Sequence, residues 1–463
     1  MIRVYNTLTR QLEEFVTRDP GKVGMYVCGP TVQSEPHVGH GRAAVAFDVI
    51  RRYLTWRGYE VTCVRNVTDV EDKIIAAANE TGESMEALAA RMGARFAEAY
   101  RGLGVLDPDI EPKASEHIPE IIDLTQRLID RGLAYAADGD VYFRVSALES
   151  YGKLSGVRPE ELRAGYRIEV GEHKLDPLDF ALWKGAKPGE PHWDSPWGAG
   201  RPGWHIECSV MAEKYLGMGF DIHGGGTDLI FPHHENEIAQ SEGVSGATFA
   251  RYWLHNGMVN LAGEKMSKST GRVVDLLTIL GGRGGQALRL LYLRAHYRSP
   301  IDYSEELLDE AEEALTRLHR FLERVTPGEP DAAALERFRE VMDEDFATPE
   351  ALSLAFDLVR DGNRLADAGE DASGIAGAVR VILDVLGVDD AWPAPDELPD
   401  VAPVAERFGV TSAGVAAIEE LIEKRRVARA ERRFDEADAI RSALAEAGIQ
   451  LEDRPDGTRW VRG

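Results

Sequence analysis

Residues 23 to 54 decide the fold: V-G-M-Y-V-C-G-P-T-V-Q-S-E-P-H-V-G-H-G-R-A-A-V-A-F-D-V-I-R-R-Y-L. The apolar run 23–28 predicts a short buried strand, and the G-P-T beginning at residue 29 is a turn signal. The apolar repeat from residue 43 predicts a helix that ends near Gly58. A second strand, Y-E-V-T-C-V-R-N-V, follows. This order predicts a doubly wound α/β sheet, in which ligands bind at the carboxyl ends of parallel strands.

Three polar residues follow these two predicted strands. Cys28 and Thr31 come at the end of the first strand, and Thr68 comes just past the second. Because the carboxyl ends of neighbouring parallel strands meet at one edge of a sheet, we expect the three side chains to converge there.

The segment I-F-P-H-H-E-N-E-I, residues 230 to 238, carries a candidate metal pair. His233 and Glu237 are four residues apart, so on a helix they would lie one turn apart on the same face. With Cys28 and Cys208 they would complete a tetrahedral set of donors that suits zinc. The alternative is a helix start with ordinary polar side chains in solvent, which the spacing alone does not exclude.

Two histidines and a pair of lysines are candidates for phosphate binding. His37 and His40 flank a Val-Gly pair at a predicted helix start, where backbone and imidazole donors suit phosphate oxygens. Lys265 and Lys268 lie in the polar loop G-E-K-M-S-K-S-T-G and could neutralise charge on a transferring phosphate. Solvated loop histidines and an exposed lysine loop are the alternatives.

The segment F-D-I-H-G-G-G-T-D, which begins at Phe220, predicts a strand that runs into a glycine turn. It lacks the G-x-G-x-x-G spacing of a dinucleotide fingerprint. Gly226 could nevertheless let a nucleotide sugar approach the backbone, with the Asp228 carboxylate accepting hydrogen bonds from its hydroxyls.

Composition limits the class of protein. The chain has 463 residues, enough for about three domains, and 44% of them are hydrophobic. It has no run near the roughly 18 apolar residues of a membrane span and no apolar signal-peptide core at its beginning. Three cysteines do not form a disulfide framework and fit a reducing cytosol.

The charge distribution contains a contrast. The net charge of −26 argues against general nucleic-acid binding, because a polyanion would be repelled. After a Pro- and Asp-rich linker, however, one predicted helix is strongly basic, which fits either a solvated helix face or a phosphate-binding surface. Its basic residues are Lys424, Arg425, Arg426, Arg429, Arg432 and Arg433.

Over essentially its whole length, the chain resembles the bacterial cysteinyl-tRNA synthetases, a family of class I aminoacyl-tRNA ligases. H-V-G-H at 37–40 stands in the place of the class motif H-I-G-H, and K-M-S-K-S at 265–269 matches the second motif. More specific similarities are Y-V-C-G-P-T-V from residue 26, G-W-H-I-E-C-S from residue 203 and H-G-G-G-T-D-L-I-F-P-H-H-E-N-E from residue 223.

The resemblance implies a Rossmann-type doubly wound catalytic domain with an insertion, a helical bundle and a small α+β C-terminal domain. The implied boundaries are 1–115 and 201–255 for the two halves of the catalytic domain, 116–200 for the connective insertion, 256–303 for the K-M-S-K-S loop and stem-contact region, 304–390 for the bundle, and 404–463 for the anticodon-binding domain.

The resemblance also assigns roles within the active site. One zinc ion per chain is expected on Cys28, Cys208, His233 and Glu237, where it would bind the thiol of L-cysteine directly. Zinc prefers a thiolate to a hydroxyl, so the metal would separate cysteine from serine better than a pocket of matching shape. The implied residues around cysteine are Thr31, Thr68 and Trp204. Those implied around ATP and its Mg²⁺ are His37, His40, Gly226, Asp228, Lys265 and Lys268.

The implied reaction is a two-step ligation. Cysteine reacts with ATP to form cysteinyl-adenylate, and the cysteinyl group then passes to the 3′ end of tRNA(Cys). The implied tRNA contacts are Arg425, Arg429, Arg432 and Trp460. The resemblance further implies a cytoplasmic monomer without a membrane partner.

Two rival functions differ in what they require of the sequence. A cysteine:amino-sugar ligase of thiol biosynthesis would use the same active site but resembles a shortened synthetase without the C-terminal domain. A non-catalytic zinc or RNA-binding scaffold would not need the phosphate-binding histidines and lysines.

Overall fold

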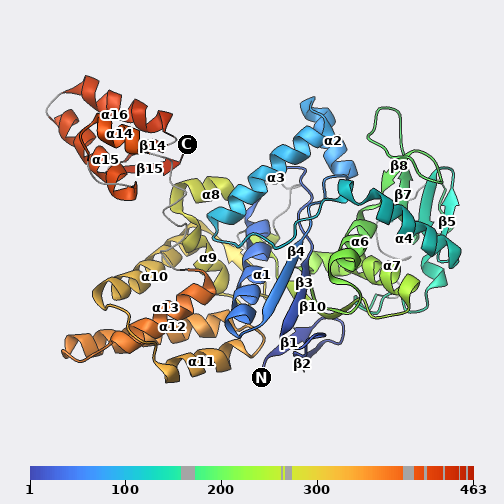
Figure 1. Ribbon diagram of the computed structural model, residues 1–463, viewed down its shortest axis with the longest axis horizontal. Helices are drawn as coiled ribbons and strands as arrows, with labels where there is room; N and C mark the ends of the chain where they lie inside the picture. The colour runs from blue at the N-terminus through green and yellow to red at the C-terminus, as the bar shows by residue number, and fades with distance from the viewer. Residues whose placement is uncertain are drawn as a thin grey trace. The chain divides into compact units, whose positions relative to one another are not determined.

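The computed structural model describes residues 1–157, 173–261, 264–265, 274–388, 401–410, 414–430, 433–447, 449–454 and 457–462 (Figure 1). The chain divides into two compact units. The first comprises 1–277 with 285–388, and the second comprises 278–284 with 389–463. None of the described helices is long and apolar enough to cross a membrane.

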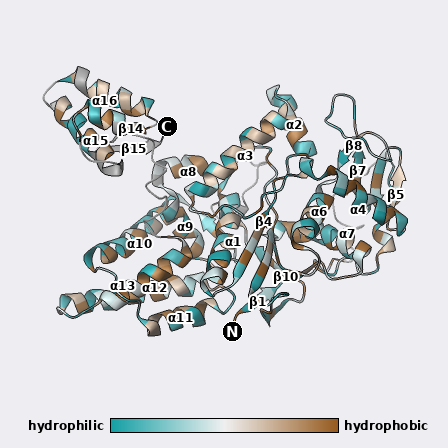
Figure 2. Cartoon of the chain, viewed as in Figure 1, coloured by the Kyte–Doolittle hydropathy of each residue, from teal (hydrophilic) through white to brown (hydrophobic). Residues whose placement is uncertain are grey.

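A four-stranded parallel sheet lies at the centre of the first unit, in the order β10-β9-β3-β4. Much of its strand surface is hydrophobic (Figure 2) because its central strands are buried on both faces, as in other parallel sheets. The strands are β3 (Lys22–Val27), β4 (Glu60–Arg65), β9 (Phe220–Gly226) and β10 (Ala250–Asn256). This confirms the predicted doubly wound α/β fold.

The strand order reverses between β3 and β9. Helix α1 (Val38–Trp56) connects β3 to β4 on one side, whereas β9 returns to the other side of β3 and β10 continues outward from it. In open α/β sheets, ligands bind in the crevice at such a reversal, outside the carboxyl ends of the strands. Cys28 follows β3 directly at this position.

A long insertion separates β4 from β9. It contains a four-stranded antiparallel sheet in the order β5-β6-β7-β8, whose apolar side packs against α4. Its elements are α2 (Asp72–Thr81), α3 (Met85–Gly102), α4 (Ile118–Asp130), β5 (Ala134–Ala137), β6 (Asp140–Phe143), β7 (Phe180–Gly185) and β8 (Gly200–Pro202).

After β10 the first unit continues into a small sheet and a helical bundle. The small sheet is formed by β11 (Val259–Leu261), β12 (Glu264–Lys265) and β13 (Ile301–Tyr303). The helices of the bundle are α9 (Gly285–Leu293), α10 (Glu305–Arg324), α11 (Ala332–Met342), α12 (Thr348–Asp367) and α13 (Ser373–Leu386). The predicted bundle is therefore present. Helix α8 (Leu276–Arg283), which precedes α9 in the chain, begins in the first unit, but most of its residues are assigned to the second.

Two buried arginines attach α1 to this region. Arg42 donates to the backbone carbonyls of Tyr292, Ala295 and His296, in and just beyond the last turn of α9. In return, the Tyr292 hydroxyl donates to the Val38 carbonyl at 2.7 Å. A guanidinium at the negative end of a helix dipole is favourable and satisfies carbonyls that the helix leaves open.

The second arginine, Arg289, pairs with the buried carboxylate of Asp48 on α1 and donates to the Leu103, Gly104 and Leu386 carbonyls. Burial alone would raise the pKa of Asp48, but the guanidiniums of Arg289 and Arg52 hold it below its usual value. The ion pair therefore joins α1, α9 and the end of α13 in one buried network.

The second unit is a small α+β domain with its own apolar core. The described chain ends in a hairpin, whose two strands pair antiparallel from Ile449 opposite Arg462 to Arg454 opposite Gly457. The elements are α14 (Ala402–Arg407), α15 (Gly414–Ala430), α16 (Phe434–Glu446), β14 (Ile449–Arg454) and β15 (Gly457–Arg462).

Candidate metal centre and active site

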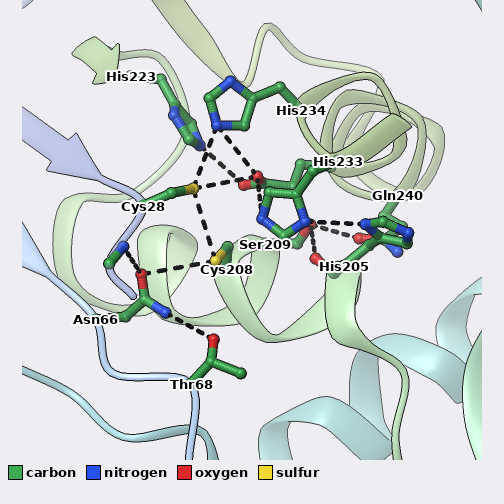
Figure 3. A network of polar contacts seen from close by, with 12 residues as sticks. Cys28, Asn66, Thr68, His205, Cys208, Ser209, His223, His233, His234 and Gln240 are labelled. Atoms are coloured by element: carbon green, nitrogen blue, oxygen red, sulfur yellow. Dashed lines mark hydrogen bonds and ion pairs between the residues drawn. The ribbon is translucent and has the colours of Figure 1, made fainter. Parts of the chain in front are cut away.

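Four candidate ligands meet at the sheet reversal. The Cys28 Sγ lies 3.8 Å from the Cys208 Sγ and 3.5 Å from the Glu237 Oε1, and His233 Nε2 lies 3.1 Å from that same oxygen (Figure 3). A tetrahedral ion with bonds of about 2.0–2.3 Å needs ligand atoms roughly 3.3–3.8 Å apart. Two thiols, an imidazole and a carboxylate at these separations fit a zinc ion.

Each ligand is placed by a different element. Cys28 donates its N–H to the Gly224 carbonyl of β9 at 3.0 Å, and Cys208 is in α6 (Trp204–Leu216). Glu237 is in the first turn of α7 (Glu235–Ser245). His233 is not in a regular helix, as the four-residue spacing had predicted, but in the kinked turn Ile230–His234 before α7. The turn still brings His233 and Glu237 into contact.

Burial determines the charge state of the pocket. It raises the pKa of Cys28 and of Glu237 well above their usual values and lowers the pKa of His233 well below its usual value. A neutral imidazole is the form that binds a metal, whereas the thiols and the carboxyl would exchange protons for a cation. The pocket is thus built to receive positive charge.

Sequence reasoning assigned no role to the other histidines that surround these ligands. His205 Nδ1 lies 2.9 Å from His233 Nδ1, and His223 Nε2 lies 2.8 Å from Glu237 Oε2. Burial lowers the pKa of both His205 and His223 to about 3, so both rings are neutral. Both histidines lie in segments that resemble the family, H-G-G-G-T-D and G-W-H-I-E-C-S, and this position was the signal that could have identified them.

Asn66, just after β4, is a second residue that sequence reasoning missed. Its Oδ1 accepts a hydrogen bond from the Gly29 N–H at 2.9 Å and lies 3.7 Å from the Cys208 Sγ. Its Nδ2 donates to the Thr68 hydroxyl at 3.4 Å. A Cβ on Gly29 would lie 1.6 Å from the Asn66 carbonyl oxygen. Only glycine at position 29 therefore lets the loop after Cys28 run so close to the Asn66 backbone.

The predicted cysteine-binding residues gather beside the ligands. Thr31 and Thr68 form a parallel bridge, in which the Val32 N–H donates to the Thr68 carbonyl at 3.2 Å. The Trp204 ring stacks on the His233 ring with a centroid distance of 4.3 Å. Trp204 thus contacts the ligand His233 directly, and Thr68 is linked to Cys208 through Asn66.

His37 and His40 cap the start of α1. His37 Nδ1 accepts from the Gly39 N–H at 3.2 Å, and His40 Nδ1 accepts from the His37 N–H at 3.1 Å. Because each neutral ring accepts at Nδ1, its proton is on Nε2, which makes Nε2 a hydrogen-bond donor. The two rings stack with a centroid distance of 3.7 Å. A helix N-terminus with two imidazole donors suits an anion.

The segment that follows K-M-S-K-S lies against this helix start. The Val38 N–H donates to the Val274 carbonyl at 3.2 Å, and the Leu276 N–H donates to the Pro36 carbonyl at 3.0 Å. Lys265 ends β12 opposite Asn260, but its side chain and the whole of Lys268 lie outside the described residues.

Gly226 and Asp228 lie at the carboxyl end of β9, next to the reversal. A Cβ on Gly226 would lie 2.4 Å from Asp228 Oδ1. The glycine therefore leaves room for this carboxylate beside the backbone, on the edge of the sheet that also carries Cys28.

The four predicted tRNA contacts have different surroundings. Arg429 is exposed on α15, whereas Arg425, on the same helix, is only 3% exposed. Trp460 is paired with Leu451 in the hairpin, but its side chain lies outside the described residues, as does Arg432. The burial of Arg425 argues against its predicted role, because a phosphate needs an accessible guanidinium.

Three protein-family models match consecutive parts of the chain. The model described as "tRNA synthetases class I (C) catalytic domain" matches 14–313, a DALR domain matches 337–388, and a "Cysteinyl-tRNA ligase anticodon binding domain" matches 412–460.

Curated relatives match over nearly the full length. The cysteine–tRNA ligase of Geobacter sulfurreducens is 50% identical and aligned over 99% of both chains. That of Methylobacillus flagellatus is 50% identical over 100% of both, and that of Pseudomonas entomophila is 50% identical over 99% of both.

Solved structures share the fold at low identity. A Mycobacterium tuberculosis methionyl-tRNA synthetase in complex with methionyl-adenylate has a TM-score of 0.57 at 19% identity, over 84% of this chain and 96% of that one. A LeuRS–tRNA–LeuAMS complex from Agrobacterium radiobacter has a TM-score of 0.60 at 11% identity, over 86% of each chain.

Proposed function

We propose that this chain, which belongs to the cysteine–tRNA ligase family of class I aminoacyl-tRNA synthetases, activates L-cysteine with ATP and transfers it to tRNA(Cys). The observation that carries the proposal is the set Cys28, Cys208, His233 and Glu237 at the reversal of the sheet, of which all but the half-buried Cys28 are buried.

The metal part of the proposal rests on the donor chemistry. Cys28, Cys208, His233 and Glu237 would hold one zinc ion. The ion would supply a borderline-soft Lewis acid that prefers the substrate thiolate to the hydroxyl of serine. Around it, Asn66 orients Cys208 and the loop after Cys28. The hydroxyls of Thr31 and Thr68 and the ring of Trp204 would then hold the rest of the amino acid.

Activation depends on positioning and on neutralising charge, since phosphoryl chemistry leaves little covalent work to protein side chains. The Nε2 donors of His37 and His40 at the start of α1 would bind the triphosphate of ATP, which carries Mg²⁺. Lys265 and Lys268 would come from the preceding loop, after which Val274 and Leu276 form backbone hydrogen bonds with Val38 and Pro36. Gly226 and Asp228 would receive the ribose.

Transfer requires that the C-terminal unit recognise tRNA. Arg429, Arg432 and Trp460 are the proposed contacts, because arginines bind phosphates and an indole stacks on unpaired bases. The buried Arg425 is better suited to holding α15 within this unit. The protein would act as a cytoplasmic monomer, where reducing conditions keep Cys28 and Cys208 as thiols.

Two reactions separate this proposal from the cysteine:amino-sugar ligase. The purified protein should catalyse cysteine-dependent ATP–pyrophosphate exchange and charge tRNA(Cys), but it should not join cysteine to an amino sugar. Ligation to the sugar without charging would overturn the proposal. The C-terminal unit, whose sequence matches an anticodon-binding domain, favours tRNA.

A substitution in the C-terminal unit tests the proposed recognition of tRNA separately from the activation of cysteine. Arg429→Ala should weaken tRNA charging about two- to fivefold, the effect of one exposed phosphate contact, and leave ATP–pyrophosphate exchange unchanged. Arg407→Ala, on α14, is a control in the same unit. Equal losses in both assays would contradict a tRNA-specific role for Arg429.

A further inference from the structure

The metal pocket contains a second set of four potential ligands. Cys28 and Glu237 belong to both sets, and His223 and His234 replace Cys208 and His233 in the second. Figure 3 shows His223 and His234 on the side of Cys28 away from Cys208. All members of the second set except the half-buried Cys28 are buried.

The two separations from Cys28 in the second set match a tetrahedral ion, and the separation between His234 and Glu237 is slightly longer. His234 Nε2 lies 3.3 Å from the Cys28 Sγ and 3.9 Å from Glu237 Oε1, and those two atoms are 3.5 Å apart. Bonds of about 2.0–2.3 Å require edges of roughly 3.3–3.8 Å. The fourth donor, His223 Nε2, lies 2.8 Å from the other Glu237 oxygen.

Residues outside the set hold both imidazoles in place. His234 Nδ1 lies 2.8 Å from His255 Nε2, and His255 Nδ1 lies 2.8 Å from the Thr7 hydroxyl. When His234 donates from Nδ1 along this chain, its Nε2 keeps a lone pair for a metal, the arrangement that metal-binding histidines usually have.

His223 is fixed by packing rather than by hydrogen bonding. Its ring stacks on the Trp253 ring with a centroid distance of 4.3 Å and an interplanar angle of 15°. Its Nδ1 is buried without a hydrogen-bond partner among the described residues. No neighbour in that part of the chain therefore fixes its tautomer, and Nε2 can either donate to Glu237 or offer a lone pair.

We propose that the pocket is a two-position metal site, in which Cys28, His223, His234 and Glu237 form an alternative coordination set for the same ion. This inference rests on the proposed metal role of the pocket and extends it. Because the two sets share Cys28 and Glu237, they hold one ion in total and exclude each other.

The two positions differ in chemical character. The first set has two thiolates and one imidazole, whereas the second has one thiolate and two imidazoles. Thiolates make a site softer, so an ion in the second position discriminates less strongly for the thiol of cysteine. Loss of Cys208 should therefore lower selectivity for cysteine over serine without emptying the pocket.

Metal content tests the proposal in the full-length protein. After equilibration with Zn²⁺ and removal of loosely bound metal, we expect one ion per chain in Cys208→Ala. Cys208→Ala with His223→Ala should bind Zn²⁺ at least tenfold more weakly. Cys208→Ala with His205→Ala is the matched control, because His205 is buried in the same pocket but belongs to neither set, and it should keep the ion.

Cobalt replaces zinc in a second measurement. Co²⁺ in Cys208→Ala should keep tetrahedral d–d bands and show about half the thiolate-to-cobalt charge-transfer intensity of the wild type. Loss of the ion from Cys208→Ala, with the far-UV circular dichroism of the wild type, would overturn the two-position site. If Cys208→Ala does not fold, His233→Ala is measured with the same expectation, and loss of the ion from folded His233→Ala overturns the two-position site. Failure of the wild type itself to bind an ion would instead contradict the proposed metal function.

Discussion

The metal pocket and the start of α1 are the two halves of the proposed active site, and they are organised in opposite ways. The pocket assembles residues almost two hundred positions apart, such as Cys28 and Cys208, and packing of the core holds them in place. His37 and His40 are neighbours in the chain, and hydrogen bonds within one helical turn orient them. The geometry of the metal pocket is set by packing of the core. The histidine motif, in contrast, is positioned only through contacts of α1 with the rest of the protein.

These contacts of α1 form a buried network. Arg42 and Tyr292 join the first turns of α1 to α9, and Asp48 and Arg289 fix the middle of the same helix. Buried charges are costly and contribute to stability only when their partners are in place. The network therefore fixes the position of α1 against α9, which local sequence does not determine.

The largest expected effect comes from removing the ligand that both metal sets share. Cys28→Ala should abolish binding of stoichiometric zinc and lower kcat/KM for cysteine at least about 1,000-fold, because coordination by a metal is worth several kcal/mol. Metal analysis and ATP–pyrophosphate exchange measure both. Cys63→Ala is the control, since Cys63 is a buried core thiol outside the pocket. Zinc retained in Cys28→Ala would show that the metal pocket does not depend on this ligand.

The second effect should be confined to the reaction with ATP and should leave the metal pocket unchanged. His40→Ala should lower the rate of adenylate formation about 100-fold, the usual consequence of removing one preorganised donor. Zinc content and the KM for cysteine should stay unchanged, because His40 belongs to the helix start and not to the metal pocket. A parallel loss of zinc would show that the two halves are not separately organised.

The third effect concerns stability and its dependence on pH. Asp48→Asn should lower the free energy of unfolding by about 2 kcal/mol at neutral pH, because it leaves Arg289 buried without its counter-ion. The pKa of Asp48 is lowered in the folded protein, so its ionised form stabilises the fold. This contribution is present above the unfolded pKa of about 3.9 and is lost as the pH falls through the lower folded value.

Urea unfolding at a series of pH values measures this difference. The gap between wild type and Asp48→Asn should be constant near neutrality and narrow in strongly acidic solution. Asp343→Asn is a comparison in the same unit, at the contact between Tyr53 and the bundle. A gap that widens on acidification would mean that the ionised carboxylate of Asp48 destabilises the fold.

The smallest effect is expected from a change at the contact between Tyr292 on α9 and Val38 on α1. Tyr292→Phe removes only the hydroxyl that bonds the Val38 carbonyl, so we expect adenylate formation to slow about five- to tenfold, the value of one buried hydrogen bond. The KM for ATP should rise while the KM for cysteine stays the same. Tyr303→Phe is the comparison, because its hydroxyl donates to Glu305 and not to the backbone of α1. Equal changes in both KM values would argue for a merely structural role.

Much of the site could be predicted from the residues because its strongest signals are local. The position of Cys28 and Thr68 after two apolar runs, and the motif H-V-G-H before an amphipathic helix, each depend on a few consecutive residues. The spacing of Asn66, His223 and His234 did not show what they would face, and for the two histidines the only signal was their position in a segment that resembles the family. Arg425 is the opposite case, because its charge predicted a surface contact whereas packing in the C-terminal unit buries it.

By itself, the sequence determined the alternation of strands and helices, the capped start of α1 and the chemical types of the metal ligands. These properties follow from hydrophobic periodicity, backbone capping and donor chemistry, which act over short stretches of chain. Only the tertiary structure decided that β9 returns beside β3, that the kinked turn before α7 presents His233 to Glu237, and that further imidazoles surround them. Those outcomes depend on packing between distant segments, whose net stability is a small difference between large opposing free energies.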